Sequence, residues 1–298
     1  MRKLALMLAR YFFTVTGRIA PFIAVRVGEK LFTTPFYSKR RDVEFELLQS
    51  ADRFQIAMDD GRSMQGYRWG NREDPVVLFV HGWTATATCF MSFIDPLLEQ
   101  GYQVVSYDVI AHGESPGWSV SVSEWADTVV AAMKELGSVE CIVGHSVGAG
   151  AVIVASSLGL QTRKVVLVSP LTDILEVVER FAQTLSIPDD VVHRMHQYAW
   201  EKYHYSASRY GTDWTDIFNS PFKVPTLLIH DIDDMEITVS HARQLVQRWP
   251  WAVLHETRRL GHRRILINPG VISSAMDFIV ESGPNSAVAT ERTLLQAG

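Results

Sequence analysis

A serine flanked by two glycines is the residue of this chain best placed to do chemistry. The pentapeptide Gly144-His145-Ser146-Val147-Gly148 follows the apolar run Val139–Val143 and opens the small-residue stretch Val147–Leu158. A strand, a sharp turn and a helix in this order present a nucleophilic serine, with glycines where backbones come close and a helix N-terminus that favours negative charge. The alternative is a tight turn with an idle serine. We predict that Ser146 is a nucleophile.

A serine hydroxyl needs a base to activate it and an acid to orient that base. In the strand–turn–helix arrangement, the acid and then the histidine follow the serine along the chain. His262 follows the last predicted core strand, in the segment Leu260-Gly261-His262-Arg263. A loop histidine after a glycine is accessible and free to be aimed. We predict His262 as the base, and the alternative is an ordinary surface histidine.

Three aspartates compete for the role of the acid. The loop directly after the predicted strand Thr226–His230 contains Asp231, Asp233 and Asp234. This loop is where the acid is expected to lie. Asp231 could instead shape the turn, and Asp233 could be a solvated neighbour. The whole cluster could also cap the helix predicted from about Thr238. The residues alone leave these alternatives open.

Backbone N–H groups are needed to bind the negative oxygen that forms during acyl transfer. One should belong to Val147, directly after the serine, and the other to Trp83 in the loop His81-Gly82-Trp83. Gly82 lets the backbone approach the site. We predict that the His81 side chain fixes this loop. The side chains of Trp83 and His145 are predicted to line the substrate pocket, although Trp83 could simply pack.

The elements that must position these residues change character along the chain. Strand-like segments with a turn at Asp59-Asp60-Gly61 predict an antiparallel start to a sheet. Continuous apolar runs then alternate with helical stretches, which predicts an α/β fold with a mostly parallel sheet flanked by helices. The predicted strands are Val43–Leu48, Phe54–Met58, Met64–Trp69, Val76–Val80, Gln103–Tyr107, Val139–Val143, Lys164–Ser169, Thr226–His230 and Ala252–Thr257.

Residues 171–222 break the alternation, because they are too long for a simple loop and are rich in aromatic residues. We predict that they form a helical cap inserted after the sixth strand of the core. The core then comprises residues 42–170 and 223–282. Residues 1–41 form an N-terminal arm, and residues 283–298 resemble a flexible tail.

The N-terminal arm is strongly basic. Residues 1–41 carry nine basic side chains against Glu29 alone, a charge of +8, so the remainder carries −13 of the total of −5. The arm lacks the ~20 apolar residues that a membrane span needs. The arm is predicted to form a helix that either packs on the body or lies in a membrane interface. Leu6 and Phe13 lie on one side of this helix. The opposite stripe consists of Leu4, Met7, Leu8, Tyr11, Phe12 and Val15.

Composition limits the choice of partner and compartment. The total charge of −5 gives no reason to expect nucleic acid as a partner. Cys89 and Cys141 have no metal-ligand spacing, so we predict free buried thiols and no metal site. Free thiols favour a reducing compartment. We expect a cytoplasmic location, with peripheral membrane contact through residues 1–41 as the further possibility.

Four separated signatures, taken together, resemble the α/β-hydrolase fold family across residues 43–282. They are His81-Gly82-Trp83, the segment from Asp108 to Ser115 with His112-Gly113, the Ser146 turn and Gly261-His262. The family pattern His-Gly-x-x-Asp-x-x-Val matches residues 230–237, with Asp231 in place of glycine and Ile237 in place of valine. The resemblance therefore selects Asp234 as the acid. It makes His112 structural and leaves Asp173, which follows the strand that precedes the cap, as the second candidate for the acid.

The resemblance implies a function as well as a fold. A serine at this turn disfavours the haloalkane dehalogenases and epoxide hydrolases, which use aspartate there. The family mechanism is two-step acyl transfer by Ser146, His262 and Asp234, with no metal or organic cofactor. We expect a carboxylesterase acting on a small-molecule ester with a hydrophobic portion. The alternatives are a thioesterase, lipase, C–C bond hydrolase or acyltransferase, or a non-catalytic, membrane-associated binding protein.

Overall fold

One mixed sheet runs through the body of the protein, whose computed structural model describes residues 2–36, 40–208 and 223–281. Its strand order is β1-β2-β4-β3-β5-β6-β7-β8. The β1–β2 and β2–β4 pairs are antiparallel and the later pairs are parallel, which confirms the predicted fold class. The strands are β1 (Asp52–Ala57), β2 (Ser63–Trp69), β3 (Val76–Val80), β4 (Gln103–Tyr107), β5 (Val139–His145), β6 (Thr162–Val168), β7 (Thr226–Asp231) and β8 (Ala252–Thr257).

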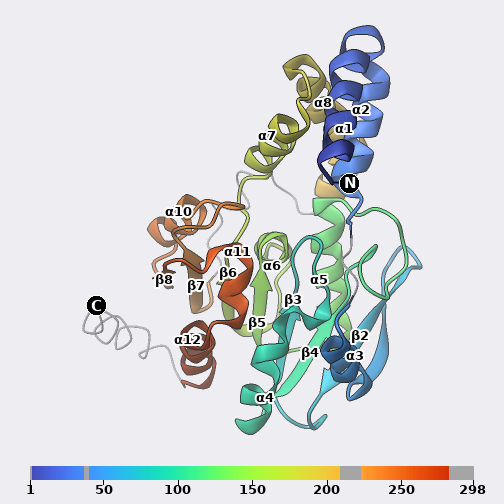
Figure 1. The fold of residues 1–298 in the computed structure, drawn as a ribbon. Helices are drawn as coiled ribbons and strands as arrows, with labels where there is room; N and C mark the ends of the chain where they lie inside the picture. Colours follow the sequence, from blue (N-terminus) through green and yellow to red (C-terminus); the bar gives the residue numbers. More distant parts are fainter. Residues whose placement is uncertain (1, 37–39, 209–222, 282–298) are drawn as a thin grey trace.

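The central strands are apolar throughout because both faces of the sheet are covered by helices. In β3, Leu78 and Val80 pack into the cluster on one face, while Val77 and Phe79 pack into the cluster on the other. The first face is covered by α5 (Val122–Leu136), α6 (Val147–Ser156) and α10 (Ser240–Arg248), and the second by α4 (Met91–Glu99) and α12 (Pro269–Val280). Because parallel strands end at a common edge, the loops after β3, β5, β7 and β8 meet there (Figure 1).

The predicted strand Val43–Leu48 is wrong, because this segment is helix α3 (Asp42–Gln49). Its alternating apolar and acidic residues imitate the period of a strand. Asp42 and Glu44 instead occupy the first helical turn, and the Glu44 carboxylate accepts a hydrogen bond from the Arg41 backbone N–H. Acidic side chains at a helix N-terminus are stabilising, so the local chemistry favours a helix here.

Two helices lie within the residues predicted as the cap: α7 (Ile174–Leu185) and α8 (Asp189–Ser208). Residues 209–222 of the predicted cap and the predicted tail 283–298 lie outside the described residues. After the last strand come α11 (Gly261–Arg264) and the short 3-10 turn η2 (Ile265–Ile267), while a second 3-10 turn, η1 (Ala87–Phe90), follows β3.

The predicted arm contains a helical hairpin, α1 (Arg2–Ile19) and α2 (Pro21–Thr33), which lies beside α7 and α8 (Figure 1). A separate apolar cluster joins the four helices, with Phe13 and Val25 from the hairpin against Val191 and Met195 from α8. Among the residues that the structure describes, no helix is both long enough and apolar enough to cross a bilayer. The apolar cluster shows that the hairpin packs on α7 and α8 through one of its faces.

An ion pair ties the chain after the hairpin to the buried turn that follows β4. Arg40 donates to the Oδ2 atom of Asp108 at 2.9 Å and to Glu114 at 2.8 Å. The Asp108 carboxylate is fully buried and also accepts from the Tyr67 hydroxyl and from the Ala87 N–H. Such a buried carboxylate is stable only when it is this fully hydrogen-bonded, so Arg40 fixes where the arm meets the body.

Candidate active site

Ser146 occupies a strained turn between β5 and α6, as the sequence predicts. Its φ of 58° and ψ of −127° lie outside the regions that a non-glycine residue ordinarily adopts. The flanking glycines make this turn possible: a Cβ at Gly144 would lie 2.7 Å from the Ala149 Cα, and one at Gly148 would lie 2.3 Å from the His81 carbonyl oxygen. The Ser146 backbone N–H donates to the Val168 carbonyl on the adjacent strand at 2.9 Å. The neighbouring strands therefore maintain the strain that aims the side chain.

Ser146, His262 and Asp234 form one hydrogen-bonded chain. The Ser146 Oγ lies 3.0 Å from the His262 Nε2, and the His262 Nδ1 lies 2.7 Å from the Asp234 Oδ2. All three residues are buried. A carboxylate facing Nδ1 holds the proton on that nitrogen, so the Nε2 lone pair is directed at the serine hydroxyl. The three predicted residues thus come together in the geometry of a nucleophile, a base and an orienting acid.

Asp234 is held as an ionised carboxylate. Burial by itself would raise its pKa, but hydrogen bonds from His230 and His262 outweigh burial and hold the pKa well below its usual value. Its Oδ1 atom also accepts from the backbone N–H groups of Glu236 and Ile237, at 2.8 and 3.0 Å. An ionised Asp234 can stabilise a positive charge that develops on the His262 ring.

The competing aspartates have other partners. Asp231, which stands where the family has glycine, accepts from the Thr257 hydroxyl and the Leu260 N–H, and so ties the β7 loop to the loop after β8. Asp233 accepts from the Arg259 N–H at 2.9 Å. Asp173 caps α7 by accepting from the Leu175 N–H at 2.8 Å. Each of these carboxylates organises backbone, and Asp234 is the one that contacts His262.

His145 supports the loop that carries His262. Its Nε2 donates to the His262 carbonyl at 2.9 Å, and the two rings lie 4.7 Å apart. Burial, and then the neighbouring His262, lower the pKa of His145 to about 3, so the ring is neutral at pH 7. The structure thus shows the His145 ring bound to the His262 loop. Its role in lining the substrate pocket stays a prediction.

His81 fixes the loop that carries the second predicted oxyanion donor. Its Nε2 accepts from the Val109 N–H at 3.0 Å, so its Nδ1 carries the proton and donates to the Gly82 carbonyl at 2.9 Å. Burial lowers its pKa to about 4. The half-buried Trp83 ring packs against His112 and Trp125, with ring centres 5.6 and 5.7 Å away. The His81 hydrogen bonds and the packing of the Trp83 ring together hold this loop in place.

The two predicted oxyanion donors are available to a ligand. Val147 is the first residue of α6, whose N–H has no partner within the helix. Among the hydrogen bonds of the described residues, neither the Val147 nor the Trp83 backbone N–H is a donor. A Cβ placed on Gly82 would lie 2.8 Å from the Ser146 Cβ, so the loop passes directly against the serine. Both amides belong to segments that touch Ser146.

The close approach of Gly82 gives a testable prediction. Gly82→Ala is expected to lower kcat for the predicted acyl transfer about a hundredfold, since the added methyl displaces the loop predicted to supply an oxyanion donor. Steady-state kinetics with a chromogenic ester would measure the loss. Gly270→Ala is the matched control, because its Cβ would lie 3.3 Å from the Asn268 side chain, in a helix that does not contribute to the triad. Equal rates for Gly82→Ala and the native protein would contradict the placement of the donor.

His230 is a contact of the site that the sequence analysis did not single out. Its Nε2 lies 3.5 Å from the Asp234 Oδ2 and 3.0 Å from the Ile237 carbonyl oxygen. The available signal was its position at the end of β7, four residues before Asp234. His230 thus helps to hold the carboxylate in place.

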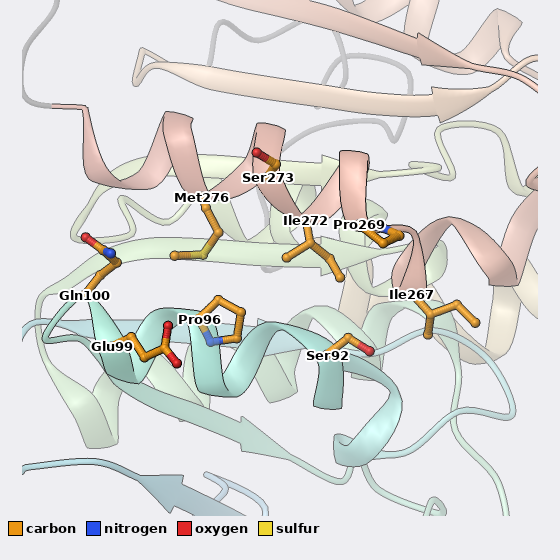
Figure 2. A pocket seen from close by; sticks show the side chains of 9 residues that line it. All are labelled: Ser92, Pro96, Glu99, Gln100, Ile267, Pro269, Ile272, Ser273 and Met276. Atoms are coloured by element: carbon orange, nitrogen blue, oxygen red, sulfur yellow. The ribbon is translucent and has the colours of Figure 1, made fainter.

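A surface groove between α4 and α12 lies apart from this site (Figure 2). Figure 2 shows Pro96 and Met276 facing each other across it, with Ile272 and Ile267 farther along. None of its lining residues belongs to the triad or to the Gly82 loop, so it has no part in the chemistry described above.

Comparisons with known proteins identify the family. The profile described as "Alpha/beta hydrolase family" matches residues 77–275, which include Gly82, Ser146, Asp234 and His262. This chain belongs to the alpha/beta hydrolase family. Its similarity to curated relatives is local: it is 33% identical over 100 residues to a bifunctional esterase/perhydrolase of Acinetobacter calcoaceticus. That match spans 33% of this chain and only 36% of the relative.

Solved alpha/beta hydrolases share the fold over much more of the chain. An esterase of Pyrococcus furiosus superposes with a TM-score of 0.64 at 22% identity, covering 83% of this chain and 98% of that one. A bacterial membrane phospholipase A superposes with a TM-score of 0.60 at 17% identity and covers 94% of this chain and 98% of its own. At such identities these alpha/beta hydrolases support the fold alone.

Proposed function

We propose that this protein is a serine hydrolase that cleaves carboxylic esters through an acyl-enzyme on Ser146. The observation that carries the proposal is the hydrogen-bonded chain from the Ser146 Oγ through His262 to Asp234. The esterase among the curated relatives supports the same substrate class. We propose no metal or organic cofactor, because the reaction needs only a nucleophile, a base and oxyanion donors.

In the first half-reaction, the His262 Nε2 accepts the Ser146 proton while the Oγ attacks the ester carbonyl carbon. The carbonyl oxygen becomes negative and binds the N–H groups of Val147 and Trp83, at the positive end of the α6 helix dipole. The protonated His262, stabilised by Asp234, then donates its proton to the departing alkoxide. An acyl group remains on Ser146 and the alcohol leaves.

The second half-reaction repeats these steps with water. His262 takes a proton from the water molecule, whose oxygen attacks the acyl carbon. The same N–H groups hold the oxyanion, and the proton on His262 returns to the Ser146 Oγ as the carboxylic acid leaves. Both half-reactions use one base and one oxyanion site, so no rearrangement of the triad is needed between them.

A substrate series tests this proposal. We expect p-nitrophenyl esters to be hydrolysed, with a burst of nitrophenol where deacylation is slow. Matched thioesters, and acyl acceptors other than water, distinguish an esterase from a thioesterase or an acyltransferase. A higher kcat/KM for thioesters would replace the proposed substrate class while keeping the mechanism. Folded protein that acts on none of these acyl compounds would contradict the proposal.

A further inference from the structure

The α1–α2 hairpin is firmly seated on the cap helices through one face only. A Cβ on Gly17 would lie 2.8 Å from the Pro188 Cγ, and one on Gly28 would lie 2.8 Å from the Met195 Sδ. Phe13 is fully buried in the same contact. The packing of α1 is therefore already complete on the side that carries Phe13 and Gly17.

The opposite side of α1 is apolar and uncovered. Leu4, Met7, Leu8 and Tyr11 recur at intervals of three and four residues, which places them on one helical stripe. Between 60 and 71% of each of these residues is exposed. The turn between the helices adds Ile19 and Phe22, also exposed, at the end of the hairpin farthest from the sheet (Figure 1). An uncovered apolar surface of this extent on a packed helix marks an interaction site.

The charge of the hairpin indicates what covers this surface. Arg10, Arg18, Arg26 and Lys30 of the hairpin are exposed, while its one acidic residue, Glu29, is buried. Arg10 donates to the Thr184 carbonyl and Arg26 to the Tyr198 hydroxyl on the cap helices, which leaves Arg18 and Lys30 as the basic border of the apolar surface. Arg26 and Lys30 also line a shallow hollow with Trp118, which is itself largely exposed. Apolar and aromatic side chains bordered by basic ones suit the boundary between the headgroups and acyl chains of an anionic bilayer. Two equally basic hairpins facing each other would repel.

We propose that the α1–α2 hairpin docks the protein on the surface of an anionic membrane. The stripe of Leu4, Met7, Leu8 and Tyr11 enters the interface, and the side chains of Arg18 and Lys30 contact lipid phosphates. Because the hairpin is packed on α7 and α8 through its other face, docking also holds the cap close to the membrane, with the hairpin between them. The proposal goes beyond the proposed hydrolase function, since docking does not require the triad.

Flotation with lipid vesicles tests the docking directly. Full-length protein is mixed with phosphatidylcholine vesicles that either contain or lack phosphatidylglycerol. Three double variants are compared with the native chain: Leu8→Gln with Tyr11→Gln on the stripe, Arg18→Gln with Lys30→Gln on the basic border, and Leu158→Gln with Val280→Gln. The last pair is the matched control, because both residues are apolar and exposed but lie on the α/β body of the protein and not on the hairpin.

We expect the native chain and the control to float with the anionic vesicles. The stripe variant should lose at least tenfold in partitioning, and the basic-border variant should lose its preference for anionic over neutral vesicles. Equal flotation of the stripe variant and the native chain would overturn the proposal. So would a native dimer in light scattering that the stripe variant abolishes, without vesicle binding, since the surface would then join two copies. Flotation needs no activity, so failure of the proposed hydrolysis leaves this test intact.

Discussion

Ser146→Ala is expected to lower kcat for ester hydrolysis by about 10⁴- to 10⁶-fold, leaving the folded protein otherwise intact. The reason is geometric: the Oγ lies 3.0 Å from the His262 Nε2, and it is the atom that we propose forms the acyl-enzyme. His262→Ala should cost about as much, since the serine hydroxyl is a poor nucleophile without its base. The double variant should be no slower than either single one, because the two residues act as a unit.

Matched controls separate the catalytic groups from their neighbours. Ser157→Ala removes a hydroxyl at the other end of α6, which bonds the Val154 carbonyl, and should leave kcat unchanged. Asp234→Asn should lower kcat about 10⁴-fold by favouring the wrong His262 tautomer. Asp173→Asn keeps an N-cap on α7 and should remain active. A reversed result for the two aspartates would move the acid to Asp173.

Stability is expected to fall steeply below pH 6.5, because the site rests on buried neutral histidines. Burial lowers the pKa of His81 to about 4 and that of His145 to about 3, and burial with the neighbouring His81 lowers that of His112 to about 3. In the unfolded chain a histidine titrates near 6.5. Unfolding between these values therefore takes up a proton at each residue. The stabilisation is complete above pH 6.5 and is lost as the pH falls towards 4.

The three histidines together should reduce the free energy of unfolding by about 6 kcal/mol between pH 7 and pH 5, or about 2 kcal/mol each. This is a large part of the roughly 5–15 kcal/mol that stabilises a typical protein. Urea unfolding at pH 7, 6 and 5 measures it. His112→Asn can still donate to the Ile110 carbonyl but cannot titrate, so its pH dependence should be about one third weaker. The exposed His193→Asn is the control, and equal slopes for both variants would contradict this account.

The turn around Ser146 can be predicted from the sequence because its signals are local. The glycines around Ser146 are required by contacts within a few ångströms of the turn, and they can be recognised from the pentapeptide itself. Asp234 could be selected only through the family resemblance, because the three aspartates differ in which distant backbone groups they bind. The Asp231 carboxylate, for example, accepts a hydrogen bond from the backbone N–H of Leu260, 29 residues away. No short sequence pattern around the three aspartates shows which of them contacts the histidine.

Contacts between remote segments are what the sequence leaves undetermined. The hydrogen bond from His145 to the His262 carbonyl spans 117 residues and has no local signature. The alternation in Val43–Leu48 predicts a strand, but the acidic first turn makes a helix. In α1 both sides are apolar, so periodicity cannot decide which side packs. The structure buries the side with Phe13 and exposes the stripe with Leu8 and Tyr11.

Labelling with a fluorophosphonate tests the central claim most directly, because this probe reacts with a serine activated by a neighbouring base. Intact-mass and peptide mass spectrometry should find one probe per chain, on Ser146. Labelling should be absent from Ser146→Ala and His262→Ala and unchanged in Ser157→Ala. Folded native protein that takes up no probe, or a label that persists in Ser146→Ala, would contradict the assignment of Ser146 as the nucleophile.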